Sequence, residues 1–188
     1  HQQTEGYRES WVRLLMILGL DISTSITGYT IVTIDGKIVE IGHWDTRNKN
    51  KFKDLFEKVK YIKKQLSNLD YPIDHIYIEP ALNMFMMGKS SSHTISTLTK
   101  FNGIVSWLCY EEFGVKPEYI PAISARKKCG ITIKRGQKAK EQVMKFLLDT
   151  EPNFVIQYTS KGNPKPYCYD EADSLIIAKA GSVCLKKE

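Results

Sequence analysis

Four acidic residues hold positions from which they could bind metal ions. Asp21 ends an apolar run, and Glu79 lies near the end of the segment HIYIEP at residues 75–80. Asp170 and Asp173 lie three residues apart in YDEADSLIIAKAG, so a helix there would carry both on one face. Like charges at short range raise one another's pKa and destabilise a fold, and a divalent cation removes that penalty.

The chemistry that such a cluster supports is phosphodiester hydrolysis. Hard oxygen ligands suit Mg²⁺, for which Mn²⁺ substitutes, and two ions about 4 Å apart activate water and stabilise the leaving oxygen. Each acid alone would more often be a helix cap or a salt-bridge partner. Two acids at strand ends and two on one helix face together favour the metal site. Glu171 points elsewhere on the helix and is not expected to be a ligand.

Hydrophobic patterning predicts the elements that must position these acids. Continuous apolar or β-branched segments indicate strands, and apolar residues at helical spacing indicate helices. The predicted strands are residues 14–20, 27–33, 38–44, 75–80 and 116–122, with a tight hairpin turn at DGK, residues 35–37. The predicted helices are residues 51–69, 90–113, 137–148 and 169–183, with a helical turn at 124–130 and a long loop at 150–166.

This order predicts an α/β fold. Its five-stranded mixed sheet would have three antiparallel strands followed by two parallel ones, flanked by helices on both faces. Functional groups in such sheets collect at the carboxyl ends of parallel strands. The first and fourth strands would be neighbours, so Asp21 would lie beside Glu79. The last helix would bring Asp170 and Asp173 over them.

Composition bounds the class of protein. At 188 residues the chain suits one domain, which we place at residues 16–188. We expect residues 1–15 to be a leader, vector-derived or disordered, with a short native arm as the alternative. The net charge of +6 favours a polyanionic partner. The cysteines form no CxxC pair and no apolar run could span a bilayer, so we expect a cytoplasmic protein without a membrane partner.

The positive charge is concentrated in one stretch. Residues 116–140 hold eight lysines and arginines against one glutamate. A solvated face is the alternative, but beside a metal site for phosphodiesters these cations are expected to bind DNA phosphates without reading sequence. The DNA-binding candidates are Arg126, Lys127, Lys128, Lys134, Arg135 and Lys138. Residues 51–64 are basic too, but Asp54 and Glu57 dilute them, so we interpret that helix as a solvated face.

Four motifs in this order resemble the RuvC family of Holliday junction resolvases, within the ribonuclease H-like superfamily. ILGLDISTSITGYTIV resembles its first strand and turn, and YIEPALNMFMMGKSSS resembles its glutamate segment. ARKKCGITIKRGQKAKEQVMKFLL resembles its basic stretch, and YDEADSLIIAKAG resembles its closing helix. The match runs from residue 16 to about residue 181.

The resemblance implies a Mg²⁺-dependent endodeoxyribonuclease that resolves four-way DNA junctions and leaves 5′-phosphate and 3′-hydroxyl ends. It implies two metal ions per site and no small-molecule cofactor. The implied metal-binding and catalytic acids are Asp21, Glu79, Asp170 and Asp173. Symmetric cutting of a junction needs two active sites, so a homodimer is expected, with residues 94–113 offering a second apolar face to the twin subunit.

The resemblance also assigns basic and aromatic residues. Lys140 falls where the family has a catalytic lysine near the scissile phosphate, and Lys138 is the near alternative. Lys89 falls where the family has another basic residue. Phe85 falls near an aromatic residue that stacks on bases at the junction centre. Its rivals as a wedge between bases are Met84, Met86 and Met87.

Two positions depart from the family pattern. Ile22-Ser23 stands where Pro-Gly is common, so Ser23 is expected to touch a phosphate or a metal-bound water. Ser174 stands where the closing motif usually has alanine. These departures suggest a divergent phage or viral member, acting in a bacterial or infected host cell, whose substrates extend to other branched DNA.

Three other functions remain open. A nucleic-acid-binding module of the same fold would have lost catalysis, which the presence of all four acids argues against. A ribonuclease H would cut RNA–DNA hybrids, but the closing Asp-x-x-Asp helix fits resolvases better. The first motif also resembles the phosphate loop of sugar kinases and actin-like ATPases, whose second domain this chain is too short to contain.

Overall fold

The computed structural model describes residues 13–81 and 91–188. Its core element is a five-stranded sheet in the order β3-β2-β1-β4-β5. The central strand β1 (Met16–Asp21) pairs antiparallel with β2 (Ile26–Thr33) and parallel with β4 (His75–Ile78). The outer strands are β3 (Ile38–Asp45), antiparallel to β2, and β5 (Glu118–Tyr119), parallel to β4. The predicted mixed sheet and its strand directions are therefore confirmed.

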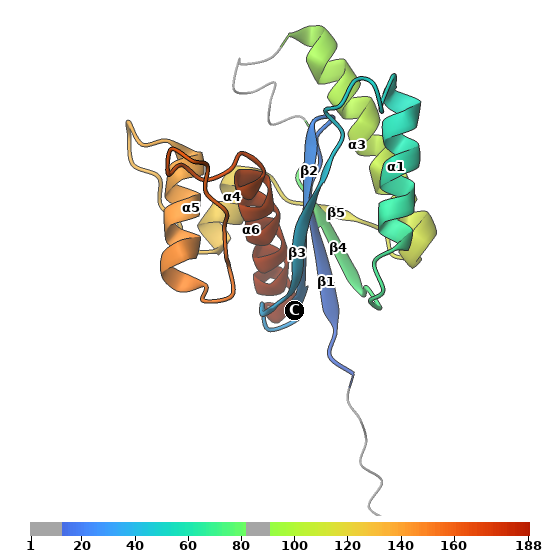
Figure 1. Ribbon diagram of the computed structural model, residues 1–188. Coiled ribbons are helices and arrows are strands. Elements are labelled where there is room, and N and C mark those ends of the chain that lie inside the picture. The colour runs from blue at the N-terminus through green and yellow to red at the C-terminus, as the bar shows by residue number, and fades with distance from the viewer. Residues whose placement is uncertain (1–12, 82–90) are drawn as a thin grey trace, which may run out of the picture.

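Helices cover both faces of the sheet (Figure 1). On one face lie α1 (Leu55–Ser67) and α3 (Ser92–Phe113). On the other face α6 (Tyr167–Lys186) packs on the strands, with α4 (Ala122–Lys128) and α5 (Ala139–Thr150) outside it. β1 is buried on both sides: Ile17 belongs to the α6 cluster, while Leu18 and Leu20 belong to the α1–α3 cluster. This two-sided burial explains its continuous apolar sequence.

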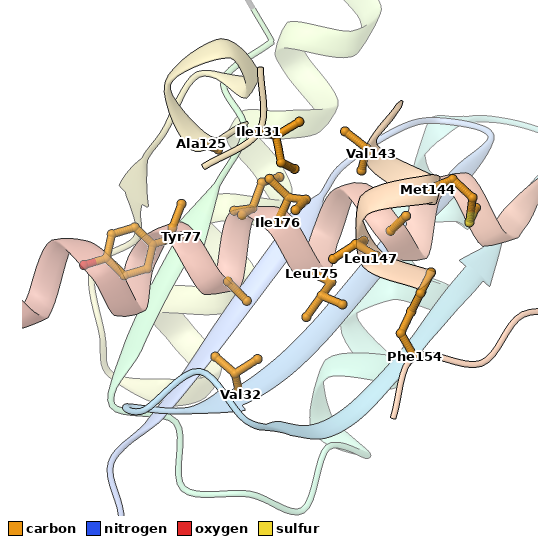
Figure 2. Packing of buried hydrophobic residues seen from close by; sticks show 14 of the residues in the cluster. Val32, Tyr77, Ala125, Ile131, Val143, Met144, Leu147, Phe154, Leu175 and Ile176 are labelled. Atoms are coloured by element: carbon orange, nitrogen blue, oxygen red, sulfur yellow. The ribbon is translucent and has the colours of Figure 1, made fainter. Parts of the chain in front are cut away.

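The helix α6 lies very close to the sheet. Figure 2 shows Leu175 and Ile176 of α6 among side chains from the sheet, α4 and α5. The approach requires glycine at Gly28 of β2, because a Cβ there would lie 2.0 Å from the carbonyl oxygen of Asp170. The first turn of α6 therefore rests directly on β2.

Several predicted boundaries move for local reasons. The helix predicted at 51–69 begins only at Leu55, because the Asp54 side chain accepts the Glu57 N–H at 2.9 Å and caps it. The strand predicted at 116–122 shrinks to two residues between Pro117 and Pro121, which lack the N–H that a ladder needs. No helix in residues 13–81 or 91–188 is both long and apolar enough to cross a membrane.

Part of the segment predicted as a leader is described. Arg13 forms an ion pair with Asp74 at 2.5 Å, and the Asp74 carboxylate also accepts the Met16 N–H at 2.8 Å. These bonds attach the chain before β1 to the segment before β4. Residues 1–12 lie outside the described part of the chain.

Candidate active site

Asp21 and Glu79 lie side by side at the carboxyl ends of two parallel strands. Asp21 is the last residue of β1, and Glu79 directly follows β4. The Glu79 N–H donates to the Leu20 carbonyl at 3.3 Å, which continues the ladder to the acids themselves. Asn102 of α3, which is buried, donates its side-chain amide to the Glu79 carbonyl at 3.0 Å. The sequence analysis missed Asn102, although a lone amide within the apolar stretch of α3 was a readable signal.

The first two turns of α6 bring Asp170 and Asp173 to the same place. Gly28 allows this approach, as described above, and Ser174 fixes it from within the helix. The Ser174 hydroxyl donates to the Glu171 carbonyl at 2.7 Å and lies 2.7 Å from the Thr30 hydroxyl of β2. The Ser174 hydroxyl thus bonds the helix to the sheet, which an alanine at this position could not do.

Burial and mutual repulsion disturb the titration of these acids. Burial raises the pKa of Asp21 well above its ordinary value, and the charges of Asp173, Glu79 and Asp170 raise it further. Burial and then the charge of Glu79 raise the pKa of Asp173 to about 7. Burial raises the pKa of Asp170 to about 6. The charges of these four acids therefore act on one another.

The carboxylates fit a divalent cation in chemistry. Among the described residues, no three side chains of His, Cys, Asp or Glu converge in a metal-ligating arrangement. The raised pKa of Asp21 instead favours a proton on that carboxyl, beside Glu79. A hard cation would replace that proton and neutralise the cluster, so the donor set suits Mg²⁺ or Mn²⁺.

Two predicted cations reach the acids. Lys140, exposed in the first turn of α5, lowers the pKa of both Asp170 and Asp173 through its positive charge. Arg126 of α4 acts on Asp173 in the same way. Lys138, the alternative to Lys140, forms an ion pair with Glu141 at 3.7 Å.

The other predicted DNA-binding residues fall in three places. Those further along the basic stretch, on α4 and in the segment before α5, are Lys127, Lys128, Lys134 and Arg135. Ser23 lies in the turn after β1, where its hydroxyl accepts the Ser25 N–H at 3.2 Å and its carbonyl accepts the Thr27 hydroxyl at 3.0 Å. These bonds close the turn that follows β1. Phe85 and Lys89, with Met84, Met86 and Met87, lie outside the described residues.

His43 of β3 was missed by the sequence analysis. The sheet register aligns Asp21 with Gly28 and Gly28 with His43, so Asp21 and His43 lie in one row across the strands. The Nδ1 atom of His43 lies 2.9 Å from a carboxylate oxygen of Glu171. The His43 ring stacks on the Tyr167 ring, with centroids 4.0 Å apart. Glu171 thus pairs with His43. The pairing of β2 with β3 shifts by one residue at Ile31–Val32. Counting residues back from the hairpin turn would therefore not place His43 in this row.

Arg47, just after β3, is a second cation beside the site that the sequence analysis missed. Its charge and that of His43 both lower the pKa of Asp170. Arg47 also forms a two-bond ion pair with Asp45, at 3.0 and 2.7 Å. The acids therefore have cations on two sides, from β3 and from the α4–α5 region.

Comparisons with known proteins give a match at the level of structure. No protein-family model matches the sequence, and no curated protein sequence matches it. The Thermus thermophilus RuvC structure has a TM-score of 0.63 at 16% identity, over 92% of this chain and 96% of that chain. T. thermophilus RuvC in complex with Holliday junction substrate has a TM-score of 0.62 at 12% identity, with the same coverage. This likeness establishes the ribonuclease H-like fold.

Proposed function

We propose that this chain is a metal-dependent endonuclease that cuts branched DNA and resolves four-way junctions. The observation that carries the proposal is the cluster of Asp21, Glu79, Asp170 and Asp173 on a ribonuclease H-like fold. Protein charge of one sign is gathered there at a cost to stability, which a binding role for divalent cations explains. A solved neighbour of this fold is RuvC in complex with Holliday junction substrate, which supports branched DNA as the substrate class.

In this proposal each group has a stated task. The four carboxylates hold the cations, which supply Lewis acidity for activating water and stabilising the leaving oxygen. Lys140 neutralises charge on the scissile phosphate, because its own positive charge already reaches Asp170 and Asp173. Water attacks the phosphorus and the bond to the 3′ oxygen breaks; one proton of the water goes to the leaving 3′ oxygen, and the new 5′-phosphate releases the other to solvent. The products are a 5′-phosphate and a 3′-hydroxyl.

A symmetric junction calls for two copies of the site, so we propose a two-fold homodimer. The candidate interface is the apolar groove between α1 and α3, with a volume of about 520 Å³. Phe56 and Trp107 line it with 80% and 58% of their surfaces exposed. On α3, the buried side chains of Phe101 and Val105 pack in the core. The proposed dimer face therefore consists of Ile104, Trp107 and the α1 residues that line the groove with them.

The test is cleavage of synthetic four-way, three-way, flap and RNA–DNA hybrid substrates, mapped on every strand. With Mg²⁺ we expect paired cuts at symmetry-related positions of the four-way junction, and with a chelator none. Cleavage of the hybrid alone would instead support a ribonuclease H. Tight junction binding without cleavage in Mg²⁺ or Mn²⁺ would support a non-catalytic binding module.

A further inference from the structure

A second basic segment lies beside the candidate site. The loop between β3 and α1 contains RNKNKFK at residues 47–53, with a cation at every second position. All four cations, Arg47, Lys49, Lys51 and Lys53, are exposed. Lys51 and Lys53 are expected from the sequence to lie on a helix with a solvated face, but both precede α1.

The acids next to this loop are already engaged. Asp45 pairs with Arg47, and Asp54 caps α1. Among the described residues, no carboxylate forms an ion pair with Lys49, Lys51 or Lys53. The loop therefore presents uncompensated positive charge, and an anionic partner would relieve the repulsion among its cations.

Hydrogen bonds hold the loop to the turn that follows Asp21. At its start, the buried Thr46 donates its N–H to the Ser25 carbonyl at 2.8 Å and its hydroxyl to the Thr24 carbonyl at 2.8 Å. Lys58 of α1 also donates to the Thr24 carbonyl, at 2.5 Å. The loop is thus fixed relative to the acids.

Within the loop, the backbone is also ordered. The Asn48 side chain accepts the N–H groups of Asn50 and Lys51, at 2.9 and 3.2 Å, and Phe52 is buried with 6% of its surface exposed. The Lys51 ammonium lies 5.3 Å from the Phe52 ring centroid and 5.0 Å from that of Tyr61. A preordered loop loses little conformational entropy on binding a ligand.

The loop and the α4–α5 region flank the acids from opposite sides. β3 is the outer strand on one side of β1, and β5, which leads into α4, is the outer strand on the other. With strands about 4.8 Å apart, the sheet edge between them spans roughly 20 Å. That span corresponds to about six nucleotide steps along one DNA strand.

We infer that the β3–α1 loop is a second surface for DNA phosphates, so that a duplex arm crossing the site is held on both flanks. The inference rests on the proposed function, and it identifies the contacts on the flank away from the 116–140 stretch. The contacts are to the backbone and would carry no sequence preference.

The test is the salt dependence of binding to a four-way junction and to a linear duplex, with a chelator present to prevent cleavage. The loop variant is Lys49→Gln/Lys53→Gln, which spares Lys51 because of its ring contacts. The matched control is Lys186→Gln/Lys187→Gln, which removes the same charge from exposed positions at the distant end of α6. Two lost phosphate contacts should make wild-type affinity fall about tenfold more than that of the loop variant between about 50 and 200 mM salt.

The control should keep the wild-type slope on both DNAs. A loop variant with the wild-type slope, or a control that loses as much slope, would overturn the inference. Binding is measured without metal, so a failure of this inference is distinguishable from a failure of the nuclease proposal. Metal-dependent cleavage with an unchanged slope would leave the nuclease standing and remove only the second surface.

Discussion

At the residue scale, the candidate site stores electrostatic strain. Asp21, Asp170 and Asp173 all have raised pKa values, chiefly because they are buried. Repulsion within the cluster adds to this effect at Asp21 and Asp173, while cations oppose it at Asp170 and Asp173. Such a cluster costs folding free energy, and binding of a divalent cation would offset that cost. Two predictions at this scale separate a metal site from a group of structural acids.

The first prediction concerns Asp21→Asn. Removing this charge should stabilise the metal-free protein, by on the order of 1 kcal/mol, because it relieves a destabilised functional cluster. It should also abolish the added stability that Mg²⁺ gives the wild type, as measured by thermal unfolding with and without Mg²⁺. Asp35→Asn in the exposed DGK turn is the matched control and should change neither quantity. A destabilised Asp21→Asn variant would show instead that Asp21 has a structural ion-pairing role.

The second prediction concerns pH. The carboxyls of Asp170 and Asp173 have native pKa values of about 6 and about 7, above the ordinary 3.8, so the native state holds more protons than the unfolded state. Their contribution to stability is therefore full below pH 3.8 and is lost as pH rises through about 7. Urea unfolding of the chelated protein should show this loss, most clearly between pH 5 and pH 7.

Added Mg²⁺ should offset the loss increasingly as the pH rises, since the cation takes the place of the protons. The difference between wild type and Asp170→Asn/Asp173→Asn isolates these two groups from the histidines. If the wild type gained stability relative to this double variant as the pH rose without a divalent cation, the carboxylates would be favourably paired and the cluster would not be strained.

At the element scale, the seating of α6 on the sheet decides where the acids lie. Gly28 and Gly19 let the helix approach β2 and β1, since a Cβ at Gly19 would lie 2.6 Å from the Ala178 nitrogen. Ser174 then bonds the helix to Thr30. These contacts fix both the distance of α6 from the sheet and its position along its own axis. Asp170 and Asp173 are thereby placed over the ends of β1 and β4.

The third prediction tests this seating. Gly28→Ala should destabilise the protein by about 2–3 kcal/mol, because the new methyl group collides with the backbone of Asp170. That backbone is part of a rigid helix and cannot easily move away. Cleavage should fall more than stability alone explains, as Asp170 is displaced. Chemical denaturation and single-turnover cleavage below the unfolding transition measure the two effects.

Gly103→Ala in α3 is the matched control for this prediction. Apart from the backbone of its own helix and its chain neighbours, no described residue lies within 4 Å of a Cβ at Gly103, so alanine should stabilise the helix by up to about 1 kcal/mol. Because Gly103 lines the α1–α3 groove, this control is measured by chemical denaturation alone. An equally harmless Gly28→Ala would mean that α6 does not rest on β2 as described.

At the scale of the whole molecule, the proposed nuclease would use two separate surfaces. The carboxyl end of the sheet collects the acids and the cations of both flanks, while the groove between α1 and α3 offers an exposed apolar surface. These two helices form the layer on one face of the sheet (Figure 1). In the proposed dimer, the groove sets the spacing of the two sites and the sheet ends bind the arms of the junction.

The fourth prediction tests the proposed dimer. Phe56→Glu should weaken self-association by about thirtyfold or more, the scale of a central apolar contact, as measured by analytical ultracentrifugation. Junction cuts should lose their pairing while single nicks persist. Val155→Glu changes an equally exposed apolar residue, 76% against 80%, outside the groove and should leave association unchanged. A Phe56→Glu variant that remains dimeric would exclude the groove as the interface.

The order of the helices and strands, and the carboxylates of the candidate site, were readable from the sequence alone. β1 is apolar because both its faces are buried, and Asp21 is its last residue, at the carboxyl end of the sheet. The spacing of Asp170 and Asp173 follows from helical periodicity. These features depend on local pattern, which a single sequence carries directly.

The tertiary structure decided which charges face these acids. His43 joins the row of Asp21 only through a strand register that shifts at Ile31–Val32, and Asp170 reaches the site only because α6 rests on Gly28. The cations of the β3–α1 loop lie across the sheet edge from Arg126 because Asp54 delays the start of α1 and Thr46 bonds the loop to the first turn. Such relations join residues that are distant in sequence, so they depend on packing and register rather than on composition or spacing.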